Sequence, residues 1–136
     1  MPKALPAIVR AQKTQSKVAR VNFDWEDLRD VIAKIEEELR EVKEAIESQQ
    51  DKLIADELGD LLFAVVNAAR KCKIDAENAL QGATDKFVAR FNRLEDELKA
   101  HGKQLGDVDL AEMDAIWKKS KQKTPNAERP MPNLGF

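Results

Sequence analysis

The sequence is poor in the residues that bind soft metals and in those that break helices. Its 136 residues include one cysteine (Cys72), one histidine (His101), no tyrosine, five glycines and five prolines. A single cysteine cannot form an internal disulfide, so we expect a reduced, cytoplasmic setting. One cysteine and one histidine are too few for a zinc site, and Leu98, three residues before His101, leaves no Glu-x-x-His pair of the di-iron type.

Long apolar runs and a strong excess of one charge are also missing. With 23 basic and 25 acidic residues the net charge is -2, which favours neither a nucleic-acid nor a membrane partner. No stretch is long and apolar enough to span a bilayer, and the first residues contain no signal-peptide core. We expect one globular domain over residues 1–123 and an irregular tail over 124–136, where three of the five prolines lie.

The sequence is rich in helix-favouring residues, with apolar side chains at helical spacing. These patterns predict an all-α protein, an antiparallel helical bundle. The first helix has an apolar face that weakens at Gln12 and Gln15. Asp24 is expected to cap the second helix, Asp75 the fourth, and Asp109 the fifth. The expected helices cover residues 4–21, about 25–48, about 52–73, 76–99, and a short segment after 109.

Two pairs of acids stand out, because each pair is separated by three residues. Glu38 with Glu41, and Glu57 with Asp60, each lie about one turn apart on one face of a helix. The short connection between the second and third helices makes these helices antiparallel neighbours. The third helix is apolar around most of its circumference, which argues against ordinary solvent-facing charges, although a narrow solvated face remains the alternative. An oxygen-only set of this kind suits a hard divalent cation, Mg²⁺ or Mn²⁺.

Other residues suggest a phosphate-bearing ligand only in combination with these acids. Lys86, Arg90 and Lys121 could neutralise phosphate oxygens, but from spacing alone ordinary surface charge is the better interpretation of each. Trp117 is equally suited to stacking on a base and to core packing. Asn67, on the acidic stripe of the third helix, could orient a ligand or a water. No glycine-rich phosphate loop is present.

The stretches that carry these residues resemble the MazG family of nucleoside triphosphate pyrophosphohydrolases, from about Leu5 to Lys121. The match is closest to the C-terminal, catalytic domain of the two-domain members. The resemblance continues at Lys86-Phe87, Arg90-Phe91, Trp117 and Lys121. This chain departs from the family at Asn22, where other members often have glycine. The matching stretches are Leu-Pro-Ala-Ile-Val-Arg-Ala at the start, Val-Asn-Phe-Asp-Trp at 21–25, Glu-Glu-Leu-Arg-Glu at 37–41, and Asp-Glu-Leu-Gly-Asp-Leu-Leu-Phe-Ala-Val-Val-Asn at 56–67.

The resemblance implies an all-helical, dimer-forming pyrophosphatase that cuts nucleoside triphosphates, ribo or deoxy, into a monophosphate and pyrophosphate. It implies that Glu38, Glu41, Glu57 and Asp60 bind magnesium, and that Glu37 or one of the ligands accepts a proton from the attacking water. It implies that Lys86 and Arg90 offset phosphate charge, while Trp117 and Lys121 close over the nucleotide. Two alternatives remain: a non-catalytic dimerisation or nucleotide-binding module, and a narrower enzyme of the dUTPase or phosphoribosyl-ATP pyrophosphohydrolase kind.

Overall fold

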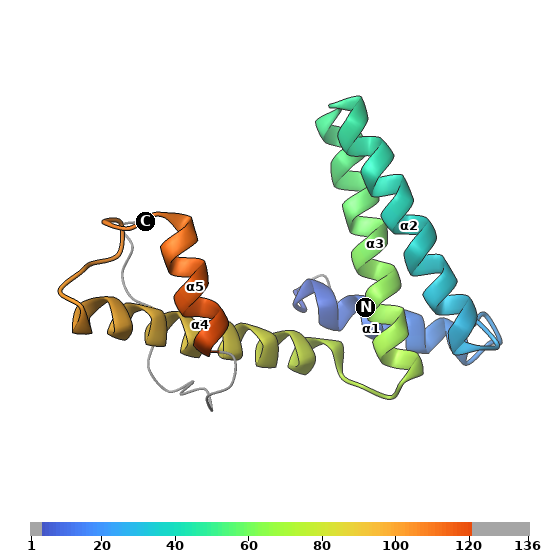
Figure 1. Cartoon of the computed structure of the whole chain (residues 1–136). Coiled ribbons are helices and arrows are strands. Elements are labelled where there is room, and N and C mark those ends of the chain that lie inside the picture. The colour runs from blue at the N-terminus through green and yellow to red at the C-terminus, as the bar shows by residue number, and fades with distance from the viewer. Residues whose placement is uncertain (1–3, 121–136) are drawn as a thin grey trace. The chain divides into compact units, whose positions relative to one another are not determined.

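The computed structural model describes residues 4–120, and within them the chain forms five α-helices and no strand (Figure 1). The prediction of an all-α protein is confirmed. No helix among these residues combines the length and apolar character needed to cross a membrane. The predicted tail, 124–136, and Lys121 lie outside the described residues. The helices are α1 (Ala7–Ala19), α2 (Leu28–Ser48), α3 (Asp51–Lys71), α4 (Ala76–Ala100) and α5 (Leu110–Ser120).

The chain divides into two compact units, Met1–Ala79 and Leu80–Phe136, called here the N-terminal and C-terminal units. In the N-terminal unit, α2 and α3 run side by side as an antiparallel pair (Figure 1). Gln49 ends α2 in the left-handed conformation (φ 59°), which allows the chain to reverse within two residues. The seam between the helices is made of small and β-branched side chains: Val31, Val42 and Ala45 of α2, and Ala64 and Val66 of α3, are buried.

Two glutamines fasten α1 to the rest of the N-terminal unit. Gln12 donates from Nε2 to the carbonyl of Ile74 (2.9 Å), and its Oε1 accepts from the amide of Ala76 (2.8 Å). Gln15 donates from Nε2 to the carbonyl of Phe63 in α3 (2.9 Å). The two positions where the predicted apolar face of the first helix weakens therefore carry the hydrogen bonds that hold that helix in place.

The prediction that Asp24 caps α2 is wrong, because Asp27 does so. Asp27 accepts a hydrogen bond from the amide of Arg29 (2.9 Å), the geometry of an N-cap. Asp24 instead pairs with Arg70 and Lys71 near the end of α3. Asn22 adopts a left-handed conformation (φ 69°), which glycine and asparagine tolerate best. The connection between α1 and α2 is therefore held against α3 by ion pairs that local sequence does not reveal.

In the C-terminal unit, α5 packs against α4 through aromatic and buried aliphatic side chains. Leu94 and Leu98 of α4 are almost fully buried, and Trp117 of α5 contacts Phe87 with ring centroids 5.2 Å apart. Asp109 accepts from the amide of Glu112 (3.0 Å), as predicted for a cap. The carboxylate of Glu112 pairs with Lys103 instead of returning to the cap.

Candidate functional site

Three carboxylates converge between α2 and α3. Glu38 and Glu41 lie one turn apart on α2, and Glu57 faces them from α3. One carboxylate oxygen from each of the three lies within 4.8 Å of the others. Glu38 is buried, with 5% of its surface exposed, and Glu41 and Glu57 are partly buried. The antiparallel pairing predicted from the short connection is what brings Glu57 to the level of Glu38 and Glu41.

The electrostatics of this three-carboxylate group are unbalanced. Lys34, one turn before Glu38, reaches one of its oxygens (3.0 Å). The second oxygens of Glu38 and Glu57 are buried and have no hydrogen-bond partner among the described residues. A hydrogen bond to Glu57, partial burial and the charge of Glu38 raise the pKa of Glu41 to about 7. Like charges held this close are stabilised by a shared proton or by a cation.

The donor set of the group defines which cations it suits. All of its ligand atoms are carboxylate oxygens, and the group contains no histidine or cysteine. Oxygen donors of this kind are preferred by magnesium, calcium and manganese, whereas zinc prefers nitrogen and sulfur. The two orphaned buried oxygens are available acceptors for such an ion. The arrangement fits a hard divalent cation.

The structure does not bring together all five predicted acids. Asp60 is exposed on α3, one turn beyond Glu57, and is not part of the three-carboxylate group. Glu37 is exposed on α2, where Lys34 lies 3.5 Å from its carboxylate. Helical spacing predicts which face of a helix each acid occupies, but it does not determine which side chains converge.

Asn67 lies on α3, where its side chain is held by a neighbour. Arg70 donates to the Oδ1 of Asn67 from Nε (3.0 Å) and from a terminal nitrogen (2.8 Å). The guanidinium also binds Asp24. A network of three residues thus links α3 to the connection between α1 and α2.

Two of the four predicted substrate-binding residues of the C-terminal unit, Arg90 and Trp117, lie in contact with each other. The Arg90 guanidinium stacks on the indole, 3.9 Å from the ring centroid, and donates to the Trp117 carbonyl (3.2 Å). Phe87 contacts the same ring system. Lys86 is exposed on α4. The structure therefore brings Arg90 and Trp117 together and leaves Lys86 in solvent.

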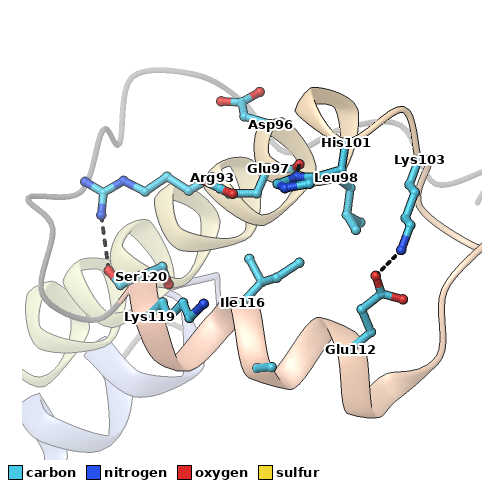
Figure 2. A pocket seen from close by; sticks show the side chains of 11 residues that line it. Arg93, Asp96, Glu97, Leu98, His101, Lys103, Glu112, Ile116, Lys119 and Ser120 are labelled. Carbon is cyan, nitrogen blue, oxygen red and sulfur yellow. Dashed lines mark hydrogen bonds and ion pairs between the residues drawn. The ribbon is translucent and has the colours of Figure 1, made fainter.

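Sequence reasoning missed a cavity in each unit. A cavity of about 840 Å³ lies between α4 and α5 (Figure 2). Lys103 and Arg93 line it, but Lys103 pairs with Glu112 and Arg93 donates to the carbonyl of Ser120 (3.3 Å). Two of the cations that line this cavity are thus already engaged within the unit, and Lys119 lines it as well.

The second cavity, of about 500 Å³, lies between α1, the connection after it, and α3. Aromatic side chains and amides share its wall: Gln15, Phe23, Trp25, Phe63 and Asn67. The only signals in the sequence were Gln15, which interrupts an apolar face, and the aromatic pair at 23 and 25.

Comparison with known proteins identifies the family. The "MazG nucleotide pyrophosphohydrolase domain" matches residues 26–94, which include α2, α3 and most of α4. A nucleoside triphosphate pyrophosphohydrolase of Escherichia coli is 44% identical over 124 residues, covering 90% of this chain and 47% of that protein. A nucleoside triphosphate pyrophosphohydrolase/pyrophosphatase MazG of Thermotoga maritima is 40% identical over 117 residues, covering 86% of this chain and 45% of that protein.

The chain spans a little under half the length of each of these two relatives. The family match begins just before α2 and contains all three members of the carboxylate group. The all-helical fold, the converging carboxylates and the extent of the match agree. This chain belongs to the MazG nucleotide pyrophosphohydrolase domain family.

Proposed function

We propose that this protein hydrolyses nucleoside triphosphates, ribo or deoxy, between the α- and β-phosphates, giving a nucleoside monophosphate and pyrophosphate. The observation that carries the proposal is the three-carboxylate group on α2 and α3, with its two buried, unpartnered oxygens. It lies inside the matched family domain. The relatives of this chain in E. coli and T. maritima are named as nucleoside triphosphate pyrophosphohydrolases.

Glu38, Glu41 and Glu57 would hold a divalent cation, Mg²⁺ or alternatively Mn²⁺, with Asp60 one turn further along α3. When bound, such an ion polarises phosphoryl oxygens and lowers the pKa of a coordinated water. The role of the helices is to fix three oxygen donors before substrate arrives. The close-packed seam between α2 and α3 makes that placement rigid, because small and β-branched side chains leave the helices little freedom to slide.

The water that attacks the phosphorus must lose a proton. Glu37, exposed on α2 beside the group, and the grouped carboxylates themselves are the candidate acceptors. Neutralisation of the triphosphate requires cations, and Lys86, Arg90 and Lys121 supply that chemistry. Arg90 is suited to phosphate because its guanidinium presents several donors in one plane. Trp117, which already orders Arg90 by stacking, is a further substrate-binding candidate.

The apolar surface of the paired helices supports a homodimer. Leu39 and Ile46 of α2 are about half exposed, as are Leu58 and Val65 of α3, and Leu62 is 63% exposed. So many large aliphatic side chains on neighbouring helices are typical of an interface with another helical surface. We therefore extend the proposal to a dimer that buries this apolar α2–α3 surface.

The direct test is a panel of ribo- and deoxyribonucleoside triphosphates, assayed with and without Mg²⁺, with product identification. The expected products are the monophosphate and pyrophosphate, and omission of the ion should abolish turnover. Release of orthophosphate would contradict the proposed bond cleavage. Binding of nucleotides by calorimetry without any turnover would favour a non-catalytic module, and turnover of a single nucleotide would favour the narrower enzymes.

A further inference from the structure

The cavity in the N-terminal unit has the composition of a site for a flat, hydrogen-bonding ring. Its volume of about 500 Å³ falls within the range of about 300–1,000 Å³ found for small-molecule sites. Phe23 and Trp25 come from the connection after α1 and Phe63 comes from α3. Phe23 is 78% exposed and Trp25 is 42% exposed. Exposed aromatic rings beside a cavity provide stacking surfaces for a planar ligand.

The amide of Gln15 supplies a hydrogen-bond acceptor that lacks a partner. Gln15 lines the cavity and only 4% of its surface is exposed. Its Nε2 donates to the Phe63 carbonyl, and because a carbonyl can only accept, the orientation of this amide is fixed. Its Oε1 is buried and has no hydrogen-bond partner among the residues the structure describes. A buried acceptor without a partner is costly, and a ligand N–H would satisfy it.

The amide of Asn67 supplies the complementary donor. The Arg70 guanidinium can only donate, so the atom that faces it must be the Asn67 oxygen. The Nδ2 of Asn67 is thereby left as the group that can donate to a ligand in the cavity. Asp24 holds Arg70 on its other side. Arg70 is thus a positioning residue that sets the polarity of this side of the cavity.

The cavity lies at a suitable distance from the carboxylate group. Asp60, Phe63 and Asn67 follow one another at spacings of three and four residues, so they share one face of α3. Glu57 and Asn67 are ten residues apart, about 15 Å along the helix axis. A nucleotide carries its base and its phosphates at opposite ends of the sugar, and it would need two sites set apart in this way.

We propose that this cavity is the nucleobase subsite, in which Gln15 accepts a hydrogen bond from the base, Asn67 donates one to it, and Phe23, Trp25 or Phe63 stacks on it. This inference rests on the proposed function for the identity of the substrate. Every nucleobase carries a donor beside an acceptor on its pairing edge. One acceptor and one donor in the cavity therefore accept the bases as a class and do not demand a single base.

The experiment compares a nucleoside triphosphate with ribose 5′-triphosphate, which has no base, as substrates of the full chain. Asn67→Asp keeps the oxygen that Arg70 binds but replaces the donor Nδ2 with an acceptor. We expect KM for ATP to rise about tenfold in this variant, with KM for ribose 5′-triphosphate within about twofold of wild type. Asn78→Asp, which adds the same charge at an exposed position of α4, should change neither KM.

Two further variants separate the roles of the lining residues. Gln15→Met removes both the orphaned acceptor and the hydrogen bond to the Phe63 carbonyl while keeping an unbranched side chain, and Trp25→Ala removes a stacking surface. Each should raise KM for ATP roughly tenfold and leave KM for the baseless substrate unchanged. An equal rise for both substrates would overturn the subsite, as would no rise in any of the three variants. The subsite would also be overturned if only Trp117→Ala raised KM for ATP while leaving KM for ribose 5′-triphosphate unchanged.

A binding measurement keeps this inference separate from the proposed activity. Calorimetry with adenosine 5′-monophosphate and ribose 5-phosphate reports base recognition whether or not the protein turns over triphosphates. Binding of the former that weakens about tenfold in Asn67→Asp supports the subsite even if hydrolysis is absent. Equal affinity for the two ligands in the wild-type protein means a cavity that holds only water, and overturns the inference while leaving the proposed hydrolysis intact.

Discussion

At the scale of single residues, the most informative feature is that three carboxylates face one another with too few cations. Lys34 offsets part of the charge on Glu38, but the second oxygens of Glu38 and Glu57 are buried without partners in the described part of the chain. Uncompensated polar groups of this kind weaken a fold unless a ligand uses them. The N-terminal unit therefore sacrifices stability at the position where we expect a cation to bind.

The first prediction follows from this imbalance. Glu57→Gln should lower kcat/KM for nucleoside triphosphates by about 100-fold or more, because one of three oxygen donors loses its charge. In the wild-type protein, millimolar Mg²⁺ should raise the melting temperature, since a ligand that binds only the folded state stabilises it. The variant should lose most of that rise.

Glu44→Gln is the matched control for this prediction, because Glu44 lies on the exposed side of α2, three residues after Glu41. It should retain both the activity and the rise in melting temperature. If Glu57→Gln kept the wild-type response to Mg²⁺, the group would not be the cation site. Calorimetric titration with MgCl₂ measures the binding without reference to activity.

The ion pairs of Asp24 lead to a prediction about pH. A hydrogen bond from Arg70 is the main cause that lowers the pKa of Asp24 below its ordinary value of 3.8, with help from the Trp25 amide and Lys71. A lowered folded-state pKa means that the unfolded chain binds the proton more tightly. The stabilisation is present above pH 3.8 and is lost as the pH falls through the lower folded value.

Asp24→Asn should therefore reduce the free energy of unfolding by about 1 kcal/mol at pH 7, as expected for a partly buried ion pair. The difference from wild type should shrink as the pH falls below 3.8. Urea unfolding at several pH values measures both quantities. Asp56→Asn, at an exposed position of α3, should show a smaller effect at pH 7; an equal loss there would contradict the assignment to Arg70.

At the scale of helices, sequence predicted more than it did at the scale of contacts. Apolar residues at helical spacing predicted all five helices, with ends within a few residues of those observed. Helix periodicity depends on neighbours three and four residues apart, so it is visible locally. The error at Asp24 arose because the deciding contact comes from a residue that is distant in the sequence. Asp24 and Asp27 are equally good caps by residue type, and the choice was made by Arg70, 46 residues away.

The same distinction between local patterns and long-range contacts explains which parts of the candidate site the sequence predicted. Spacing placed Glu38, Glu41 and Glu57 on facing helices, and the structure brings them together. Whether Asp60 joins them depends on the rotation of α3 in its seam, which packing sets and sequence does not show. The cavity at Gln15 was invisible for a further reason. Its lining comes from α1, the following connection and α3, so no local pattern contains it.

The cap at Asp27 gives a prediction at this scale. Asp27→Ala removes the side-chain acceptor for the Arg29 amide and should lower the free energy of unfolding. Asp27→Ser should recover most of the loss, because a hydroxyl also caps. Chemical denaturation of the three proteins measures the series. Equal destabilisation by alanine and serine would show that the ion pair with Arg29, and not capping, is the main contribution.

At the scale of the whole molecule, the exposed aliphatic side chains of the α2–α3 surface are the feature that a single chain leaves unexplained. Leu62 and Ile46 are more than half exposed, and Leu39, Leu58 and Val65 are exposed by more than two fifths. If the proposed dimer buries this surface, sedimentation should give twice the mass of the chain. Leu62→Glu should weaken association roughly 100-fold, because a charge would be buried without a partner.

Leu110→Glu is the control for the dimer, since Leu110 is 76% exposed but begins α5 in the C-terminal unit. An acid at the first turn of a helix is favourable there, and the variant should sediment as wild type does. A monomeric wild-type protein at micromolar concentration would contradict the dimer. Because the carboxylate group lies between the same two helices, a monomeric Leu62→Glu protein that keeps its response to Mg²⁺ would show that each chain forms its cation site alone.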